Sequence, residues 1–377
     1  MRIAFVTSDD PLDKRTWSGS CYSMARALEK HCGEVRYLGP VRPVRRVIAG
    51  ARKRLTKVLV DKNYDHLHNL SLARNYGQIF KRKIEGESFD AVFAPVAASE
   101  IAFLDVAVPI VYSSDGTFAL MKDYYRIFAN LVDRSVWEGH FVERAAIQNA
   151  RLLVYPSEWV AESAVRDYGA DRSKICVIPF GANLEQIPPR ESIFHKEESE
   201  QCRLLFVGVD WVRKGGDIAF ETLVKLREMG VPAELTVCGC VPPKESMRVA
   251  MTVIPFIDKH NETERRRLAE LYFRSDFLLL PTRAECFGIV FCEANAFGLP
   301  AITTDTGGVS GAVRNGENGF MLPLSAGAFE YARLISELWR DRPAYSSLVR
   351  SSRAAFEQRL NWDAWGTQVV KSLAAIC

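Results

Sequence analysis

Short apolar runs alternate with longer stretches of helical apolar spacing along most of the chain. The first half contains apolar runs of strand length at residues 2–7, 35–38, 90–95, 108–112, 152–157 and 175–183. Residues 21–29 and 137–149 have the spacing of helices, and another helix is expected from about residue 158. This alternation predicts a parallel sheet, because parallel strands are joined by helical crossovers.

The same pattern starts again in the second half. Strands are expected at residues 203–207, 234–238, 253–256, 276–281 and 300–304, a charged helix at 258–272, and mostly helix after the 315–319 turn. A polar stretch at 186–200, which includes two adjacent prolines, predicts an interdomain linker. We therefore expect an α/β protein with domains at 1–185 and 201–357, and a C-terminal helix at about 358–377 that packs back on the first domain.

The segment 284–300 has the most specific pattern. Glu285 precedes a Phe-Gly pair, Glu293 follows eight positions later, and Gly298 and Pro300 end the apolar run. This order predicts a loop, then a helix, then the end of that helix, with the helix N-terminus between the two carboxylates. Unpaired N–H groups there favour an anion. The pattern suggests a phosphorylated sugar, with amides on the phosphate and carboxylates on the hydroxyls.

Three other loops follow predicted strands. The loop after 203–207 contains Arg213 and Lys214 among glycines, which suits a diphosphate. Gly19 precedes the first helix, and Asp115 follows the strand at 108–112. Ligands of parallel sheets bind at the carboxyl ends of strands. A plain helix turn at Gly19 and a local Asp-Gly turn at Asp115 are the alternative interpretations.

Residues 41–60 combine basic side chains with apolar positions at helical spacing. We favour a crossover helix whose apolar face packs on the sheet and whose basic face is solvated. The alternative is peripheral contact with an anionic membrane surface.

Composition narrows the function classes. The net charge of +3 gives no general argument for nucleic acid, and no apolar run is long enough to span a bilayer. Nine scattered cysteines predict reduced thiols, and no metal site is expected, because Cys238 and Cys240 are too close for a usual zinc site. We expect a cytoplasmic protein, with the inner membrane surface as the peripheral alternative.

Together, the two glutamates flanking Phe287 and Gly288, Lys214 after a glycine-ended strand, and the turns at Gly307-Gly308 and Asn315-Gly316 resemble retaining glycosyltransferases of family 4. The resemblance covers most of the second half and, more loosely, the Gly19 loop. It implies a GT-B fold, in which two Rossmann-like domains face each other across a cleft. The first would bind the acceptor and the second the nucleotide-sugar.

The resemblance also implies residue roles. Glu285 would bind hydroxyls of the transferred sugar, Glu293 the ribose, and Lys214 the diphosphate. The remaining donor-binding positions are Gly19, Phe256, Ile257, Phe287, Gly288, Ile289 and Val290. Two departures stand out: Val209 occupies a position where the family commonly has arginine, with Arg213 as a replacement, and Asp115 stands where relatives often have histidine.

The resemblance implies a retaining, metal-independent transfer with no cofactor, from a donor expected to be a UDP-sugar to a glycan, lipid-linked or small-molecule acceptor. A nucleotide-sugar epimerase and a non-catalytic nucleotide-sugar-binding protein are the alternatives. The missing G-x-G-x-x-G pattern disfavours a nicotinamide dehydrogenase.

Overall fold

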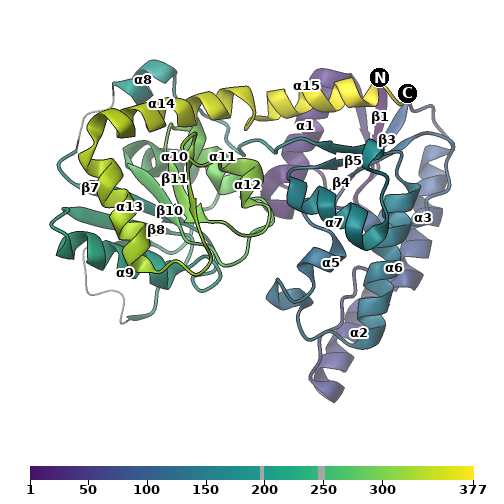
Figure 1. The fold of residues 1–377 in the computed structure, drawn as a ribbon. Coiled ribbons are helices and arrows are strands. Elements are labelled where there is room, and N and C mark those ends of the chain that lie inside the picture. The colour runs from purple at the N-terminus through teal and green to yellow at the C-terminus, as the bar shows by residue number, and fades with distance from the viewer. Residues whose placement is uncertain (196–198, 245–250) are drawn as a thin grey trace. The chain divides into compact units, whose positions relative to one another are not determined.

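The computed structural model describes residues 1–195, 199–244 and 251–377, which form two compact units (Figure 1). The first unit contains Met1–Pro179 and Trp365–Cys377, and the second contains Phe180–Ala364. The segment expected to be a linker, 186–200, contains helix α8 (Arg190–Phe194) within the second unit, and its residues 196–198 lie outside the described residues.

The first unit is built on a parallel six-stranded sheet in the order β2-β1-β3-β4-β5-β6. Its strands are β1 (Arg2–Phe5), β2 (Glu34–Tyr37), β3 (Ala91–Pro95), β4 (Ile110–Ser113), β5 (Leu152–Tyr155) and β6 (Ile175–Val177). All of the strands predicted in this half are confirmed. The last is shorter than expected, and Pro179, which has no N–H for a ladder, follows two residues after it.

Helices cover both faces of this sheet. The helices of this unit, not all of which lie on the sheet, are η1 (Thr16–Gly19), α1 (Ser20–Cys32), α2 (Val44–Val60), α3 (Leu70–Ile84), α4 (Ala98–Ile101), α5 (Phe118–Met121), η2 (Arg126–Phe128), α6 (Asp133–Asn149), α7 (Glu158–Tyr168), η3 (Arg172–Lys174) and, from Trp365, the last part of α15 (Trp362–Leu373). Ala4 and Val92 join a core cluster with residues of α3, α4, α6 and α7. Phe93, which alternates with Val92, has its ring centroid 5.8 Å from that of Trp365.

Helix α2 is where the structure contradicts our preferred interpretation. Residues 41–60 do contain a helix, but its apolar face is not packed on the sheet. Ala49 is the only buried residue of α2, whereas Val47, Leu55 and Val58 are 58–81% exposed. The periodicity identified the helix correctly, but periodicity alone does not say which face a helix buries.

The second unit repeats the architecture with the strand order β12-β11-β10-β7-β8-β9. Its strands are β7 (Cys202–Val207), β8 (Ala233–Cys238), β9 (Met251–Ile254), β10 (Phe277–Leu280), β11 (Ala301–Thr304) and β12 (Gly319–Leu322). Its other helices are α9 (Gly216–Glu228), α10 (Glu262–Arg274), α11 (Ile289–Ala296), α12 (Val309–Ala312), α13 (Ala328–Arg340) and α14 (Arg342–Gln358). Strand β12 was not predicted, because the sequence there showed only a turn.

Two other expectations can be compared with the structure. The nine cysteines all lie within the described residues and are present as thiols. Of the helices among the described residues, none is both long enough and apolar enough to cross a bilayer.

Candidate functional site

The predicted donor-binding loops of the second unit meet at one edge of its sheet. Strand β10 lies between β7 and β11, and all three are parallel, so the loops that follow them emerge side by side. Arg283 N–H donates to the Arg213 carbonyl at 2.8 Å, which ties the loop after β10 to the loop after β7. Gly308 N–H donates to the Glu285 carbonyl at 3.1 Å, which ties it to the loop after β11.

Glycine permits the close approach of the first two loops. Gly215 has φ +73°, and a Cβ there would lie 1.9 Å from the carbonyl oxygen of Pro281. This left-handed conformation precedes α9 and turns the chain directly after Lys214. The backbone therefore brings Lys214 against the loop that contains Glu285.

The Lys214 ammonium group and the Glu285 carboxylate form a buried ion pair. Arg213 Nη1 lies 3.9 Å from the same carboxylate oxygen and donates to the Ala284 carbonyl at 2.8 Å. Two cationic groups and one carboxylate thus meet beside the N-terminus of α11. The pairing of Lys214 with Glu285 stabilises both charges in a place with little water.

Helix α11 begins where the sequence predicted. Gly288 is its N-cap with φ +89°, and a Cβ there would lie 2.4 Å from the Phe291 ring. The N–H groups of Ile289 and Val290, in the first turn, have no acceptor within the helix. The structure thus places the unpaired N–H groups of this helix end near the Lys214–Glu285 pair, with Glu293 about one turn further along the helix.

Glu293 is buried and bound by two side chains. Tyr272 Oη, from α10, donates to one carboxylate oxygen at 2.9 Å, and Lys259 Nζ donates to the other at 3.0 Å. Burial raises the pKa of Tyr272 well above its usual value, and the Glu293 charge adds to this effect. The tyrosine therefore stays protonated and serves as a hydrogen-bond donor.

The other donor-binding candidates differ in what their side chains do. Phe256 is largely exposed, and Ile257 beside it is half-buried; both follow β9 in the segment that leads to Lys259. Phe287 is buried, with its ring centroid 5.2 Å from that of Phe180. The Phe287 side chain therefore belongs to the core of the second unit, and only its backbone could face a ligand.

Gly19 and Asp115 lie in the first unit, at the carboxyl edge of its sheet. Gly19, with φ +88°, follows Trp17 and Ser18, which also have positive φ values. Asp115 is half-buried after β4, next to Ser114, whose hydroxyl donates to the Gly116 carbonyl at 2.7 Å.

Sequence reasoning missed several side chains that build the site. Neither Tyr272 nor Lys259 belongs to a recognisable sequence motif. A tyrosine in a helix and a lysine in a loop are both common on protein surfaces, so nothing in the sequence singled them out. Thr282, by contrast, was expected at this edge because it directly follows the strand at 276–281; it is buried and donates to the Ala284 carbonyl at 3.1 Å. Only the fold brings these residues next to the two glutamates.

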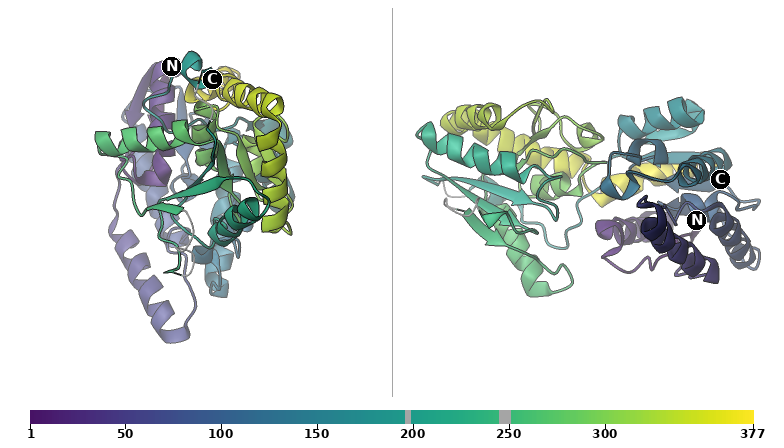
Figure 2. Two further views of the ribbon diagram at one scale, coloured as in Figure 1. Left: turned by 90° about the vertical axis from the view of Figure 1, so that its left-hand side faces the viewer. Right: turned by 90° about the horizontal axis from the view of Figure 1, so that it is seen from below.

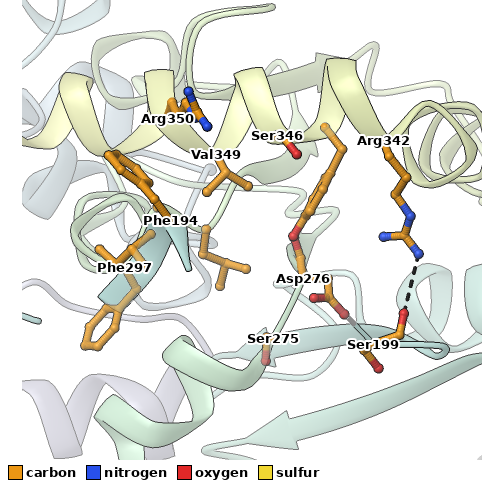
Figure 3. A pocket seen from close by; sticks show the side chains of 13 residues that line it. Phe194, Ser199, Ser275, Asp276, Phe297, Arg342, Ser346, Val349 and Arg350 are labelled. Carbon is orange, nitrogen blue, oxygen red and sulfur yellow. Dashed lines mark hydrogen bonds between the residues drawn. The ribbon is translucent and has the colours of Figure 1, made fainter. Parts of the chain in front are cut away.

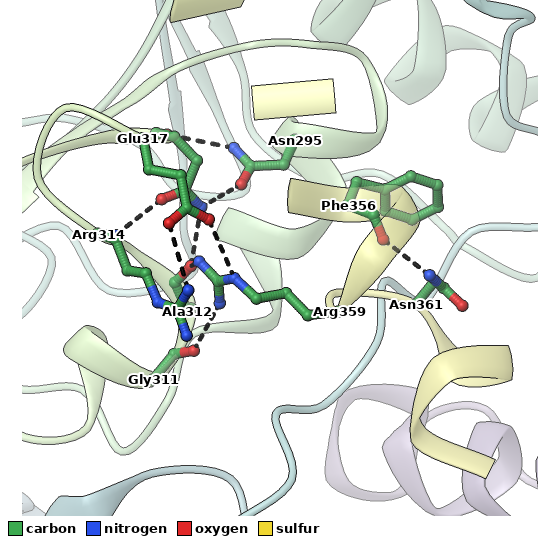
Figure 4. A network of polar contacts seen from close by, with 9 residues as sticks. Asn295, Gly311, Ala312, Arg314, Glu317, Phe356, Arg359 and Asn361 are labelled. Carbon is green, nitrogen blue, oxygen red and sulfur yellow. Dashed lines mark hydrogen bonds and ion pairs between the residues drawn. The ribbon is translucent and has the colours of Figure 1, made fainter. Parts of the chain in front are cut away.

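A second group of residues that the sequence did not indicate connects α11 to α12 and to the loop after α12 (Figure 4). Asn318 donates to Asn295 of α11 at 2.5 Å and to the Ala312 carbonyl of α12 at 2.8 Å. Arg359 donates to the Gly311 and Ala312 carbonyls at 3.0 and 3.1 Å, and its Nε lies 3.3 Å from Glu317 Oε1. This network fixes α12 relative to α11.

The pocket in Figure 3 lies at the opposite edge of this sheet. It has a volume of about 130 Å³, and its lining includes Asp276 and Leu299, which come just before β10 and β11. Arg203 already binds both oxygens of Asp276 at 3.0 Å. The pocket is therefore separate from the candidate site.

Comparison with known proteins identifies the family. A model of "Glycosyl transferases group 1" matches residues 189–355, and one of "Glycosyltransferase Family 4" matches residues 19–186. A D-inositol 3-phosphate glycosyltransferase from Xylanimonas cellulosilytica is 30% identical over 59% of this chain, which spans 56% of that relative's length. A protein of the same name from Paenarthrobacter aurescens is 24% identical, with 76% of this chain and 72% of the relative covered.

The solved structures agree on the fold. HepE from Anabaena, solved in complex with UDP and glucose, has a TM-score of 0.66 at 16% identity, with both chains fully covered. The predicted α/β fold of the GT-B class is confirmed by this agreement and by the two parallel six-stranded sheets. The two family models together account for most of the residues, and the chain belongs to the group 1 glycosyltransferases of family 4.

Proposed function

We propose that the chain transfers a sugar from a UDP-sugar to an acceptor hydroxyl group, with retention of configuration and without a metal ion. The observation that carries the proposal is the buried Lys214–Glu285 pair beside the N-terminus of α11, with Glu293 inside the same helix. Anion-binding groups thus lie between two carboxylates that can bind hydroxyl groups. This arrangement fits a sugar, a diphosphate and a ribose in that order.

Lys214 and the first turn of α11 would stabilise the departing diphosphate. Negative charge develops on the phosphate oxygen as the bond from the anomeric carbon breaks, and preorganised cations and amides lower the energy of that state. Arg213 adds a second positive charge beside Glu285. In this proposal the protein itself supplies the charge that a divalent cation would otherwise provide.

Glu285 would accept hydrogen bonds from hydroxyl groups of the transferred sugar, and Glu293 from those of the ribose. Tyr272 and Lys259 orient the Glu293 carboxylate before the donor arrives. The acceptor oxygen would attack the anomeric carbon from the face that the diphosphate leaves, and its proton would pass to the departing phosphate. Retention follows, because one bond forms on the face where the other breaks.

The proposed donor and acceptor classes rest on the names of similar proteins and similar solved structures. HepE was solved with UDP and glucose, which supports a UDP-sugar donor. The names of the curated relatives support a phosphorylated cyclitol among the acceptors to be tested, beside glycans and lipid-linked sugars. Gly19 and Asp115 are the positions of the first unit that we propose for contact with the donor phosphate and the acceptor.

The first experiment is a thermal-shift screen of nucleoside diphosphates and their sugars, since a ligand that binds only the folded state raises its stability. We expect UDP and one UDP-sugar to raise the unfolding temperature. Glu293→Ala should remove that shift, whereas Glu228→Ala, a change to an exposed glutamate on α9, should leave it unchanged. An equal response of both variants would contradict the assignment of Glu293.

The second experiment addresses the chemical step. Lys214→Ala should lower kcat more than it raises the donor KM, because Lys214 would act on charge that develops in the transition state. Lys225→Ala, at an exposed lysine on α9, is the matched control. Analysis of products from the UDP-sugar alone separates the alternatives: an epimerised donor would indicate an epimerase, and no turnover with any acceptor would favour a binding protein.

A further inference from the structure

Helix α2 exposes a continuous apolar stripe. Its apolar positions recur at spacings of three and four, which places them on one side of a helix: Val44, Val47, Ile48, Ala51, Leu55, Val58 and Leu59. Six of these seven are 58–81% exposed, and Ala51 is exposed as well. An apolar surface of this extent on a single helix is unusual for a face that contacts only water.

The helix is attached to the first unit by other positions. Ala49 is buried and lies outside the stripe. Arg46 Nη2 binds Asp9 Oδ1 at 3.0 Å, Arg45 binds the Ser71 hydroxyl, and the Arg52 guanidinium lies 4.8 Å from the centre of the Tyr64 ring. The polar and small residues thus hold α2 in place, and the stripe is left on the outside.

Basic residues flank the stripe. The helix contains Arg45, Arg46, Arg52, Lys53, Arg54 and Lys57 and no acidic residue. The nearby carboxylates of Asp9 and Asp61 pair with Arg46 and Lys57, which leaves the helix strongly positive. An apolar stripe with basic flanks is typical of helices that lie in the headgroup region of anionic membranes.

The shape of the first unit makes this face accessible. In Figures 1 and 2, α2 extends beyond the sheet and the other helices of the first unit. Its C-terminal end is tied to the segment after η2, where Asn63 N–H donates to the Asn130 carbonyl at 2.9 Å. That segment follows Ile127, another largely exposed apolar side chain. With 17 residues, the helix is about 26 Å long and could lie flat on a surface.

We propose that α2 binds the first unit to the surface of a membrane that contains anionic phospholipids. The apolar stripe enters the boundary between headgroups and acyl chains, and the arginines and lysines contact lipid phosphates. A second copy of the chain is a less favourable partner for the apolar stripe, because a symmetric contact between two α2 helices would bring like charges together. The proposal does not depend on the sugar-transfer function.

Co-sedimentation of the full chain with lipid vesicles tests the proposal that α2 binds anionic membranes. Vesicles of phosphatidylcholine with phosphatidylglycerol should bind the protein at least tenfold more tightly than vesicles of phosphatidylcholine alone, and high salt should weaken the binding. The stripe variant Ile48→Ser/Leu55→Ser/Leu59→Ser and the charge variant Lys53→Gln/Arg54→Gln/Lys57→Gln should each lose at least tenfold in affinity.

Matched controls come from the second unit. Val241→Ser/Leu324→Ser/Phe329→Ser changes exposed apolar residues, and Lys225→Gln/Arg266→Gln/Arg333→Gln changes exposed basic ones; both should bind vesicles like the unmodified protein. The unfolding temperature and the UDP-induced thermal shift of every variant report separately on folding and on the proposed donor site.

Hydrogen exchange provides the second measurement. Peptides that cover 44–60 should become protected on anionic vesicles and stay unprotected on neutral ones. Equal binding to both vesicle types, or a stripe variant that binds as well as the control, would overturn the proposal. A dimer that the stripe variant converts to monomers in the absence of vesicles would also overturn it, in favour of contact between copies.

Discussion

At the scale of single residues, the two glutamates of the candidate site differ in what holds them. Glu285 is paired with Lys214 and lies near Arg213, so two positively charged side chains surround its carboxylate. Glu293 is held by Tyr272 and Lys259, deeper in the unit. The sequence indicated both glutamates but neither Tyr272 nor Lys259, because no local pattern links a residue of α10 to one of α11.

Removing the Tyr272 hydroxyl should weaken UDP binding. A hydrogen bond to a charged group contributes about 1.5–3 kcal/mol, so Tyr272→Phe should raise the Kd roughly 10- to 100-fold if the hydroxyl orients Glu293. The ring should keep its stacking on Phe297 at 5.5 Å. Calorimetric titration with UDP measures the effect, and Tyr345→Phe at the opposite edge of the sheet is the control. Equal affinity in the two variants would argue against this role.

The His68–Asp65 pair of the first unit predicts a pH dependence of stability. Burial alone would lower the pKa of His68, but the charge and hydrogen bond of Asp65 outweigh it and raise the pKa to about 9. A raised histidine pKa gives stability that is full below the unfolded value of about 6.5 and is lost as the pH rises through the folded value. Urea unfolding should show a decline between pH 6.5 and 9 that is smaller in His68→Gln. A decline of the same size in the variant would contradict this.

At the scale of elements, tight loops before the helices decide the geometry of the site. The loops into α9 and α11 end in glycines with positive φ, and both glycines face atoms that leave no room for a Cβ. The sequence predicted the strands and helices around them well, because buried parallel strands are continuous apolar runs. It did not predict the contact between Gly215 and Pro281, which joins residues of two different loops.

Alanine substitutions at two glycines with similar φ values distinguish the cost of backbone strain from the cost of a steric clash. Gly215→Ala and Gly230→Ala both place a Cβ at φ near +74°, but the Cβ at Gly230 would meet nothing within 4 Å. We expect Gly230→Ala to lower the free energy of unfolding by about 1 kcal/mol. Gly215→Ala should cost several times more and weaken UDP binding, because Lys214 would move. Urea unfolding and titration measure both, and equal costs would contradict a role for the close approach.

At the scale of the whole molecule, the chain forms two units of the same architecture, and its last residues return to the first. Trp365 is fully buried there, and its ring contacts Phe93 edge-on. The first unit is therefore completed by a segment that follows the second unit in the sequence. The C-terminal helix was expected to pack in this way, but neither Trp365 nor its partner could be named from the sequence.

Trp365→Ala should destabilise the first unit by about 3–5 kcal/mol, the usual cost of truncating a buried tryptophan. Hydrogen exchange should then speed up in peptides from β1 and β3 and change little in peptides from β10 and α11. The exposed Trp137→Ala is the control and should leave exchange unchanged. Faster exchange in both units alike would show that the two do not unfold separately.

The sequence by itself determined the strand-helix alternation, the division into two α/β units and the loop-helix motif with its two glutamates, because these depend on short-range patterns of apolar residues and turns. Only the tertiary structure decided what surrounds those glutamates and which face of α2 is exposed. Tyr272, Lys259 and Asn318 reach the site from distant positions, and no periodicity relates them to it. For α2, the apolar stripe was evident in the sequence, but its exposure depends on how Ala49, Arg46 and their neighbours attach the helix.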